Sequence, residues 1–248
     1  VPATAHAYAE RKGFPLDGLR VNPTNGELLI PQRDPRDGSL IGVERIAARE
    51  PRSKDDKTKF QVGKRGGIFQ IGRADGEQPI LISEGVSTGY SLHRLTGWSV
   101  FVAFSAPMLA AMYQTVRFLH PGLEIAVCAD FDKAGHNNAE KAAALGASVV
   151  ELPADSQDKD DWLDLEQRHG VEITKQMFRD QWQARRKVEK IVEKPKLTIS
   201  TMTALELRRS AIKPPTWIVP NILPQGLAVL AGRPKGGKSW LALKLALS

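Results

Sequence analysis

From residue 79 onward, short apolar segments alternate with segments of helical pattern, and this alternation constrains the fold more than any other feature. Strand-like segments are expected at 80–83, 99–105, 124–130 and 148–153. Helices are expected at 87–97, 107–120, 134–147 and 161–170. Strands that alternate with helices form a mostly parallel sheet with helices on both faces. The sequence therefore predicts an α/β fold whose active residues lie at the carboxyl ends of the strands.

The flanking segments have other patterns. Residues 1–75 predict a small α+β subdomain, with a helix at 4–12 that ends at Gly13 and strand-like runs after Asn-Gly and Asp-Gly turn signals. Further strand-like residues in this part are 60–62 and 68–71. Residues 171–215 are expected to be a basic linker whose helical tract packs poorly on the core. Residues 76–170 would be the catalytic domain, and residues 216–248 the start of another domain.

The net charge of +7 is unevenly distributed. Residues 1–75 carry +4, residues 76–170 carry −7 and residues 171–248 carry +10. An acidic centre between basic flanks suggests metal at the centre and a polyanion on the flanks. A charged surface without a specific partner is an equal alternative on charge alone.

Composition narrows the setting of the protein. A single cysteine, Cys128, excludes a disulfide framework and a cysteine-based zinc site within this chain. No apolar run approaches the roughly 20 residues of a membrane span. We therefore expect a cytoplasmic protein without a membrane partner. Because the chain begins with Val1 and ends inside a helical pattern, we interpret it as a piece of a longer polypeptide.

Carboxylates follow three of the predicted strands, at the point where each strand ends. The first strand ends in Ser-Glu-Gly, the third in Asp-x-Asp, and the fourth is followed by "DKDDWLD". Because parallel strands end at one edge of a sheet, we expect these side chains to converge. The carboxylates placed in this way are Glu84, Asp130, Asp132, Asp160, Asp161 and Asp164.

Converging carboxylates repel and raise one another's pKa, and a divalent cation relieves that conflict. Oxygen ligands with few nitrogen or sulfur alternatives suit Mg²⁺ or Mn²⁺, the metals of phosphoryl and nucleotidyl transfer. Taken alone, an Asp-x-Asp after a strand is more often a turn or a helix cap. The combination at successive strand ends favours a metal site.

At these residues the chain resembles the Toprim domain, which primases, topoisomerases, recombination-mediator proteins and some nucleases share. The resemblance covers residues 79–169 and is carried by "SEG" and "ADFDKAGHNNA". It implies a catalytic role for Glu84, metal binding by Asp130 and Asp132, and a helix opened by Gly135.

Two neighbouring stretches are similar to plasmid and phage primases. "DWLD" at 161–164 resembles their Asp-Trp-Asn-Asp motif, with Leu163 in place of Asn, and implies metal binding by Asp161 and Asp164. "AYAERKG" and "KTKFQVGKRGG" are similar to the region that precedes Toprim in those primases. The zinc-ribbon module that often lies further upstream is not part of this sequence.

A phosphate-binding loop is predicted near the C-terminus. "GRPKGGKS" at 232–239 fits the Walker A pattern and lies between a strand-like and a helix-like segment. Such a loop would bind ATP, with Lys238 at the β- and γ-phosphates and Ser239 at Mg²⁺. Gly232 and Gly237 complete the pattern. The segment resembles the start of the RecA-like ATPase of plasmid helicases, but the chain ends before a Walker B acid, so we expect no ATP hydrolysis by this piece.

Together these features predict a Toprim DNA primase from a mobile-element primase–helicase. Its substrates would be a single-stranded DNA template and ribonucleoside triphosphates, with a helicase domain in cis. The template or nucleotide phosphates would contact basic residues, namely Lys57, Lys59, Lys64 and Arg65. These residues are equally interpreted as ordinary solvated charges.

Two other functions remain open at this stage. A Toprim nuclease would use the same metals with water as the nucleophile, and a non-catalytic DNA-binding or loader module would keep the fold as a scaffold. A topoisomerase would need a nucleophilic tyrosine, and the sequence offers Tyr8, Tyr90 and Tyr113. Tyr90 and Tyr113 fall in core-helix patterns, which argues against this function.

Overall fold

The computed structural model describes residues 1–49, 58–74, 76–185, 217–219 and 223–224. The chain forms two compact units, residues 1–194 and residues 195–248. In the second unit the described residues form an antiparallel pair of strands, β10 (Trp217–Val219) and β11 (Leu223–Pro224). The predicted phosphate-binding loop at 232–239 lies outside the described residues, as does Lys57.

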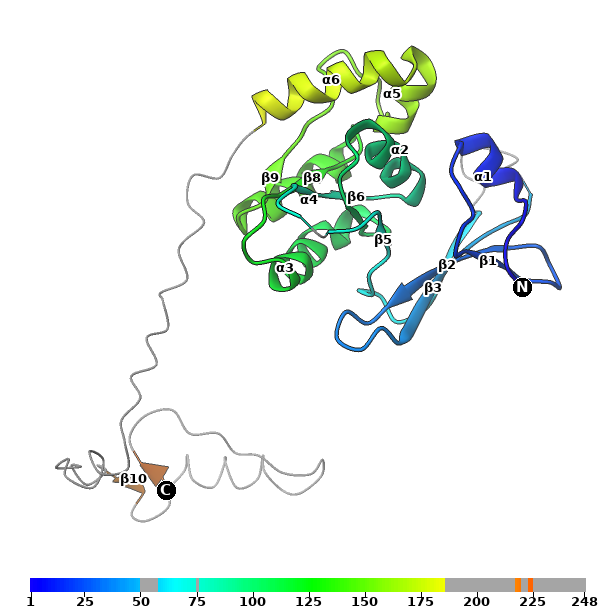
Figure 1. Cartoon of the computed structure of the whole chain (residues 1–248). Coiled ribbons are helices and arrows are strands. Elements are labelled where there is room, and N and C mark those ends of the chain that lie inside the picture. The colour runs from blue at the N-terminus through cyan, green and yellow to red at the C-terminus, as the bar shows by residue number, and fades with distance from the viewer. Residues whose placement is uncertain (50–57, 75, 186–216, 220–222, 225–248) are drawn as a thin grey trace. The chain divides into compact units, whose positions relative to one another are not determined.

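The first part of the chain forms a short helix and a four-stranded antiparallel sheet (Figure 1). Gly13 ends the helix in the left-handed conformation (φ 65°), as the sequence predicted. Alternate residues of the second strand are buried, so the sheet has one covered face. The elements, in chain order and with the strands adjacent in this order, are α1 (Ala7–Lys12), β1 (Arg20–Val21), β2 (Leu28–Arg33), β3 (Leu40–Ile46) and β4 (Lys59–Gly63).

A five-stranded sheet forms the centre of the first unit. Its order is β5-β7-β6-β8-β9, and all neighbours are parallel except β5, which is antiparallel to β7. The strands are β5 (Gln70–Ile71), β6 (Ile80–Ser83), β7 (Val100–Val102), β8 (Ile125–Cys128) and β9 (Ser148–Val149). The intervening helices are α2 (Val86–Thr96), the 3₁₀ turn Ala106–Met108, α3 (Leu109–Leu119) and α4 (Lys133–Ala144).

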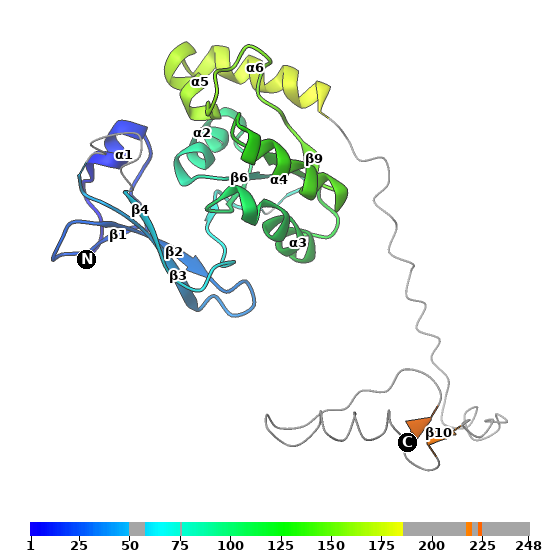
Figure 2. The same ribbon diagram turned by 180° about the vertical axis from the view of Figure 1, so that it is seen from behind.

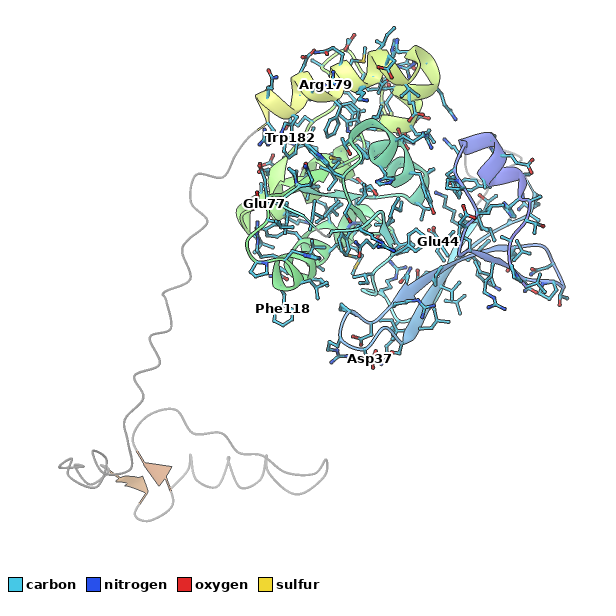
Figure 3. All side chains as sticks on the ribbon, viewed as in Figure 1. Asp37, Glu44, Glu77, Phe118, Arg179 and Trp182 are labelled. Carbon is cyan, nitrogen blue, oxygen red and sulfur yellow. The ribbon has the colours of Figure 1, made fainter. Side chains whose placement is uncertain are left out.

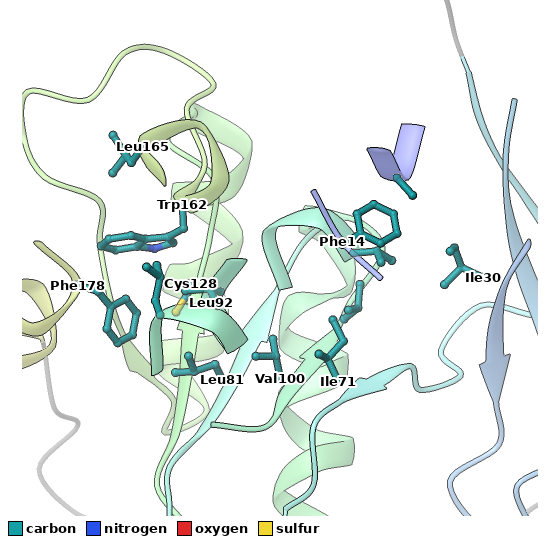
Figure 4. Packing of buried hydrophobic residues seen from close by; sticks show 14 of the residues in the cluster. Phe14, Ile30, Ile71, Leu81, Leu92, Val100, Cys128, Trp162, Leu165 and Phe178 are labelled. Carbon is teal, nitrogen blue, oxygen red and sulfur yellow. The ribbon is translucent and has the colours of Figure 1, made fainter. Parts of the chain in front are cut away.

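Helices cover both faces of this sheet (Figure 2), which confirms the predicted α/β fold. On one face, Leu81, Val100 and Cys128 pack beneath α2, α5 (Trp162–His169) and α6 (Val171–Ala184) (Figure 4). On the other face, Ile82 and Val127 pack against α3 and α4. None of the helices that the structure describes is long and apolar enough to cross a membrane.

The strand-like residues at 68–71 divide between the two sheets, and Ile68 makes an isolated antiparallel bridge with Arg33 of β2. Gln70 and Ile71 pair with Phe101 and Val100 and form the antiparallel edge of the central sheet. An apolar run predicts a strand but not its partner, because pairing depends on tertiary contacts.

The prediction that the chain packs poorly after about residue 171 is wrong for residues 171–185, and the rest of that tract up to 216 lies outside the described residues. Helix α6 buries Phe178 to 3% exposure in the core, where its ring meets those of Trp98 and Trp182. Its ring also meets that of Trp162 (Figure 4). Arg185, the next residue after the helix, forms a bidentate ion pair with Glu124, which directly precedes β8. The helix therefore belongs to the first unit.

Candidate active site

The carboxyl ends of β6 and β8 meet at one edge of the central sheet. Ser83 pairs with Cys128 in the parallel register, so Glu84 and Asp130 follow adjacent strand ends. The two residues are in contact, because the backbone N–H of Asp130 donates a hydrogen bond to Oε1 of Glu84 at 3.1 Å. The predicted placement of these carboxylates at one sheet edge is confirmed.

The surroundings of Asp130 disfavour the ionised form of its carboxyl group. Burial, and then the charges of Glu84, Asp161 and Asp132, raise its pKa from 3.8 to about 8. Its Oδ1 atom is buried, and no group in the described part of the chain donates a hydrogen bond to it. Burial also raises the pKa of Glu84. A buried carboxyl oxygen without a donor has unused capacity for a cation.

Asp132 begins helix α4 as its N-cap. Its Oδ1 accepts a hydrogen bond of 2.6 Å from the backbone N–H of Gly135, which is the cap role that an Asp-x-Asp pattern also predicted. Gly135 itself lies tightly against the site, because a Cβ there would come within 2.3 Å of the Asp130 carbonyl oxygen and 2.9 Å of Glu84 Oε1. Glycine is thus needed for the helix to start this close to both carboxylates.

The loop before α5 is tied to the segment after β8. The backbone of Phe131 exchanges hydrogen bonds with Asp160 O and Lys159 N, each at 2.8 Å. This pairing brings Asp161 near the other carboxylates, since its charge acts on both Glu84 and Asp130. The third acidic segment therefore does approach the first two.

The carboxylates of this third segment also have structural roles. Asp161 and Asp164 form a reciprocal capping box at the start of α5, and Thr88 Oγ1 donates to Asp161 Oδ2 at 2.7 Å. Asp164 Oδ1 also lies 3.5 Å from the ammonium of Lys12. Asp160 accepts a 2.7 Å hydrogen bond from Arg168. Of these three carboxylates, Asp161 interacts most directly with the acidic cluster.

The N-terminal sheet provides a basic side chain to the same site. Lys59 of β4 lies 5.3 Å from the ring centre of Tyr8, and its charge lowers the pKa of Asp130. Burial acts to lower the pKa of Lys59, but Tyr8, Glu44 and Asp130 raise it overall. The ammonium therefore stays charged beside the carboxylates. Figure 3 shows Glu44 on the N-terminal sheet.

A cavity of about 220 Å³ adjoins Lys59 at the same end of the central sheet. Arg65 and Glu44 line it, together with Phe104 and Ser105, which follow β7. Phe104 has a left-handed backbone (φ 65°), which is uncommon for a residue with a side chain. Lys64 is exposed and does not line this cavity. The structure thus brings Lys59 and Arg65, but not Lys64, to one cavity.

Two residues of the site were missed from the sequence. The Tyr8 hydroxyl lies 3.2 Å from Ser87 Oγ and joins α1 to the first turn of α2, directly after Glu84. Thr88 orients Asp161 across the site. Neither contact has a sequence signal, because each joins residues more than 70 positions apart.

Comparison with known proteins gives one family match and several similar folds. A family model described as "AAA domain" matches residues 193–248. The primase fragment of the bacteriophage T7 primase-helicase protein is 16% identical with a TM-score of 0.46, over 63% of this chain and 64% of that chain.

Two further similar structures are those of cellular primases. The DnaG catalytic core is 18% identical with a TM-score of 0.47, over 73% of this chain and 64% of that chain. A DNA primase domain from Pseudomonas aeruginosa is 16% identical with a TM-score of 0.46, over 66% of this chain and 55% of that chain. The chain spans less than two thirds of the length of each of these three structures.

Proposed function

We propose that the first unit catalyses metal-dependent nucleotidyl transfer at the carboxyl edge of its central sheet. The observation that supports this most strongly is Asp130, a half-buried residue beside Glu84 with a pKa of about 8. Its Oδ1 is buried and accepts no hydrogen bond from the residues that the structure describes. Such a group costs stability unless a cation compensates it. The arrangement fits a site built for a divalent metal.

Mg²⁺ or Mn²⁺ would be held by Glu84, Asp130 and Asp132, with Asp161 beside them. Asp164 remains in the proposed set with weaker support, because its carboxylate already contacts Lys12 and the Asp161 backbone. When bound, the metal would supply charge stabilisation for the phosphates that react. The oxygen donors of the site are the type that these hard cations take.

The reaction proposed is attack by a ribonucleotide 3′-hydroxyl on the α-phosphate of an incoming nucleoside triphosphate, which breaks the bond to the β-phosphate and releases pyrophosphate. Glu84 would accept or hold the hydroxyl proton, since burial raises its pKa toward the range useful for proton transfer near neutral pH. Lys59 and Arg65 would hold phosphates of the template or the nucleotide at the adjoining cavity. Lys57 and Lys64 remain in the proposed set of residues that bind nucleic-acid phosphates.

Within this class, the particular protein proposed is a DNA primase that acts on single-stranded DNA as part of a cytoplasmic primase–helicase. The Toprim-like and primase-like sequence motifs support the first part. The AAA domain match over residues 193–248 supports a nucleotide-binding domain in cis. ATP would bind there through Gly232, Gly237, Lys238 and Ser239.

The test is a primer-synthesis assay with labelled ribonucleotides on single-stranded DNA, run beside a nuclease assay on the same DNA with Mg²⁺ or Mn²⁺. We expect short RNA products and no shortening of the DNA. Cleavage without synthesis would replace primase by nuclease. If the protein binds DNA but shows neither synthesis nor cleavage, the result would support a non-catalytic module.

A further inference from the structure

Three side chains with metal-binding groups meet outside the catalytic carboxylates. His136 and Glu140 lie one turn apart on α4, and Glu151 follows β9. One ligand atom of each lies within 4.8 Å of the other two. The three residues come from two separate segments of the fold. His136 lies in the stretch "ADFDKAGHNNA", but none of the three was among the site residues predicted from the sequence.

We propose that His136, Glu140 and Glu151 form a second divalent-cation site, selective for cations that accept a nitrogen ligand, such as Zn²⁺ or Co²⁺. Residues four apart on a helix share one face, so the imidazole and the Glu140 carboxylate can bind one ion together. Glu151 closes the set from a neighbouring segment. One imidazole and two carboxylates leave further coordination positions for water or a ligand.

The geometry is close to that of an occupied site. Ligand atoms around a tetrahedral metal at about 2.1 Å lie roughly 3.4 Å apart. The observed 4.8 Å limit therefore closes with a movement of about 1–1.5 Å at the side-chain tips. His136 and Glu151 are exposed and Glu140 is half-buried, so rotation of these side chains displaces little of the core.

Ligand chemistry separates this site from the catalytic one. Glu84, Asp130, Asp132 and Asp161 offer only oxygen, which suits Mg²⁺. Imidazole nitrogen is a poor ligand for Mg²⁺ and a good one for Zn²⁺ and Co²⁺. The two sites should therefore respond differently to the same set of metals.

A cavity of about 370 Å³ is lined by members of both sets, namely Asp130 and Asp132 of the first and His136 and Glu151 of the second. Among its described lining residues, Asp130, Asp132, Glu151 and Asp158 are acidic, whereas Lys133 is the one Lys or Arg. A polyphosphate entering such a cavity would meet net negative charge unless cations were bound on more than one wall. This role for the second cation rests on the proposed nucleotidyl transfer, whereas the metal site itself does not.

The experiment measures metal binding in a background that lacks the catalytic carboxylates, Glu84→Gln/Asp130→Asn/Asp132→Asn. Asn is also a good helix N-cap, so position 132 keeps its structural role. The full chain, stripped of metal with a chelator, is titrated with Co²⁺ by visible absorption and with Zn²⁺ by calorimetry. We expect one equivalent to bind in this background, with a visible spectrum of nitrogen and oxygen ligation.

His136→Ala and, separately, Glu151→Gln in that background should each weaken binding at least tenfold. His169→Ala is the matched control, since His169 is also an exposed helical histidine, and it should bind as the background does. An equal concentration of Mg²⁺ should not displace Co²⁺.

Three results would overturn the proposal. They are a background protein that binds no Co²⁺ or Zn²⁺, a His136→Ala protein that binds as tightly as its parent, and full displacement by equimolar Mg²⁺. Absence of primer synthesis by the wild-type chain would instead contradict the proposed function, but it would not affect the result of the metal titration. The two proposals can therefore fail separately.

Discussion

At the scale of single residues, one side chain of the candidate active site, Asp130, is the most difficult to ionise. Asp130 is held by backbone geometry at the end of β8, among carboxylates that raise its pKa to about 8. The sequence predicted the convergence from strand ends, but it could not predict which oxygen lacks a donor. That depends on the position of Glu84, which accepts from the Asp130 backbone rather than from its side chain.

The raised pKa predicts how the metal-free protein responds to pH. Folded Asp130 keeps its proton between about pH 4 and pH 8, where the unfolded chain has already released it. The stability linked to this group is therefore complete below about pH 4 and is lost as the pH rises toward 8. We expect a loss of about 2 kcal/mol, less than the full shift would give, because Asp130 is partly exposed and water screens it.

The measurement is chemical denaturation in a chelator across this pH range. Asp130→Asn should remove most of the slope and be more stable than the wild type at pH 8. Asp155→Asn, in an exposed residue of the nearby loop, should keep the wild-type slope. An unchanged slope in Asp130→Asn would show that Asp130 is not the strained group.

Gly135 provides a second prediction at this scale. A methyl group there would meet the Asp130 carbonyl oxygen and Glu84, so Gly135→Ala should destabilise the fold by about 1–3 kcal/mol and displace Glu84. Gly122→Ala is the control, because its Cβ would meet no atom within 4 Å. Equal stability of the two variants, measured by urea unfolding, would contradict the close approach of α4 to the site.

At the scale of elements, the order of strands and helices could be predicted from the sequence. Apolar residues recur about every 3.6 positions in a helix and every two positions in a half-buried strand, so the two patterns differ. Two placements did not follow. The strand at Gln70–Ile71 joins the central sheet, because its partner is chosen by tertiary packing. The charges of the segment that forms α6 favoured a basic linker. Thr174, Phe178 and Trp182, spaced four residues apart, nevertheless lie on the face of the helix that packs against the core.

Packing of α6 is tested by Phe178→Ala, which should destabilise the first unit by about 3–4 kcal/mol because a ring surrounded by three tryptophans leaves a cavity. Phe118→Ala is the control, since Phe118 projects from α3 and is 78% exposed (Figure 3). Its effect should stay within about 0.5 kcal/mol. Similar unfolding midpoints for both variants would indicate that α6 does not pack on the core and belongs to the linker.

At the scale of the whole molecule, the chain divides at residues 194 and 195 into two units. Residues 1–194 expressed alone should therefore unfold within about 2 °C of the first transition of the 248-residue chain, a difference worth less than about 1 kcal/mol. Residues 1–170 should lose cooperative unfolding, because removing α6 exposes Trp98 and Trp162. Calorimetry of the two fragments distinguishes this boundary from one at residue 171.

The central claim is that Asp130 serves metal-dependent nucleotidyl transfer, and the most direct measurement compares primer synthesis by the wild type, Asp130→Asn and the control Asp155→Asn. The account predicts that Asp130→Asn lowers the rate by about 10²–10³-fold, roughly 3–4 kcal/mol in the transition state, because an amide is a poorer ligand for a hard dication. Its affinity for single-stranded DNA without metal should be unchanged or slightly higher, since basic residues carry that binding. Synthesis by Asp130→Asn at the wild-type rate would contradict the account.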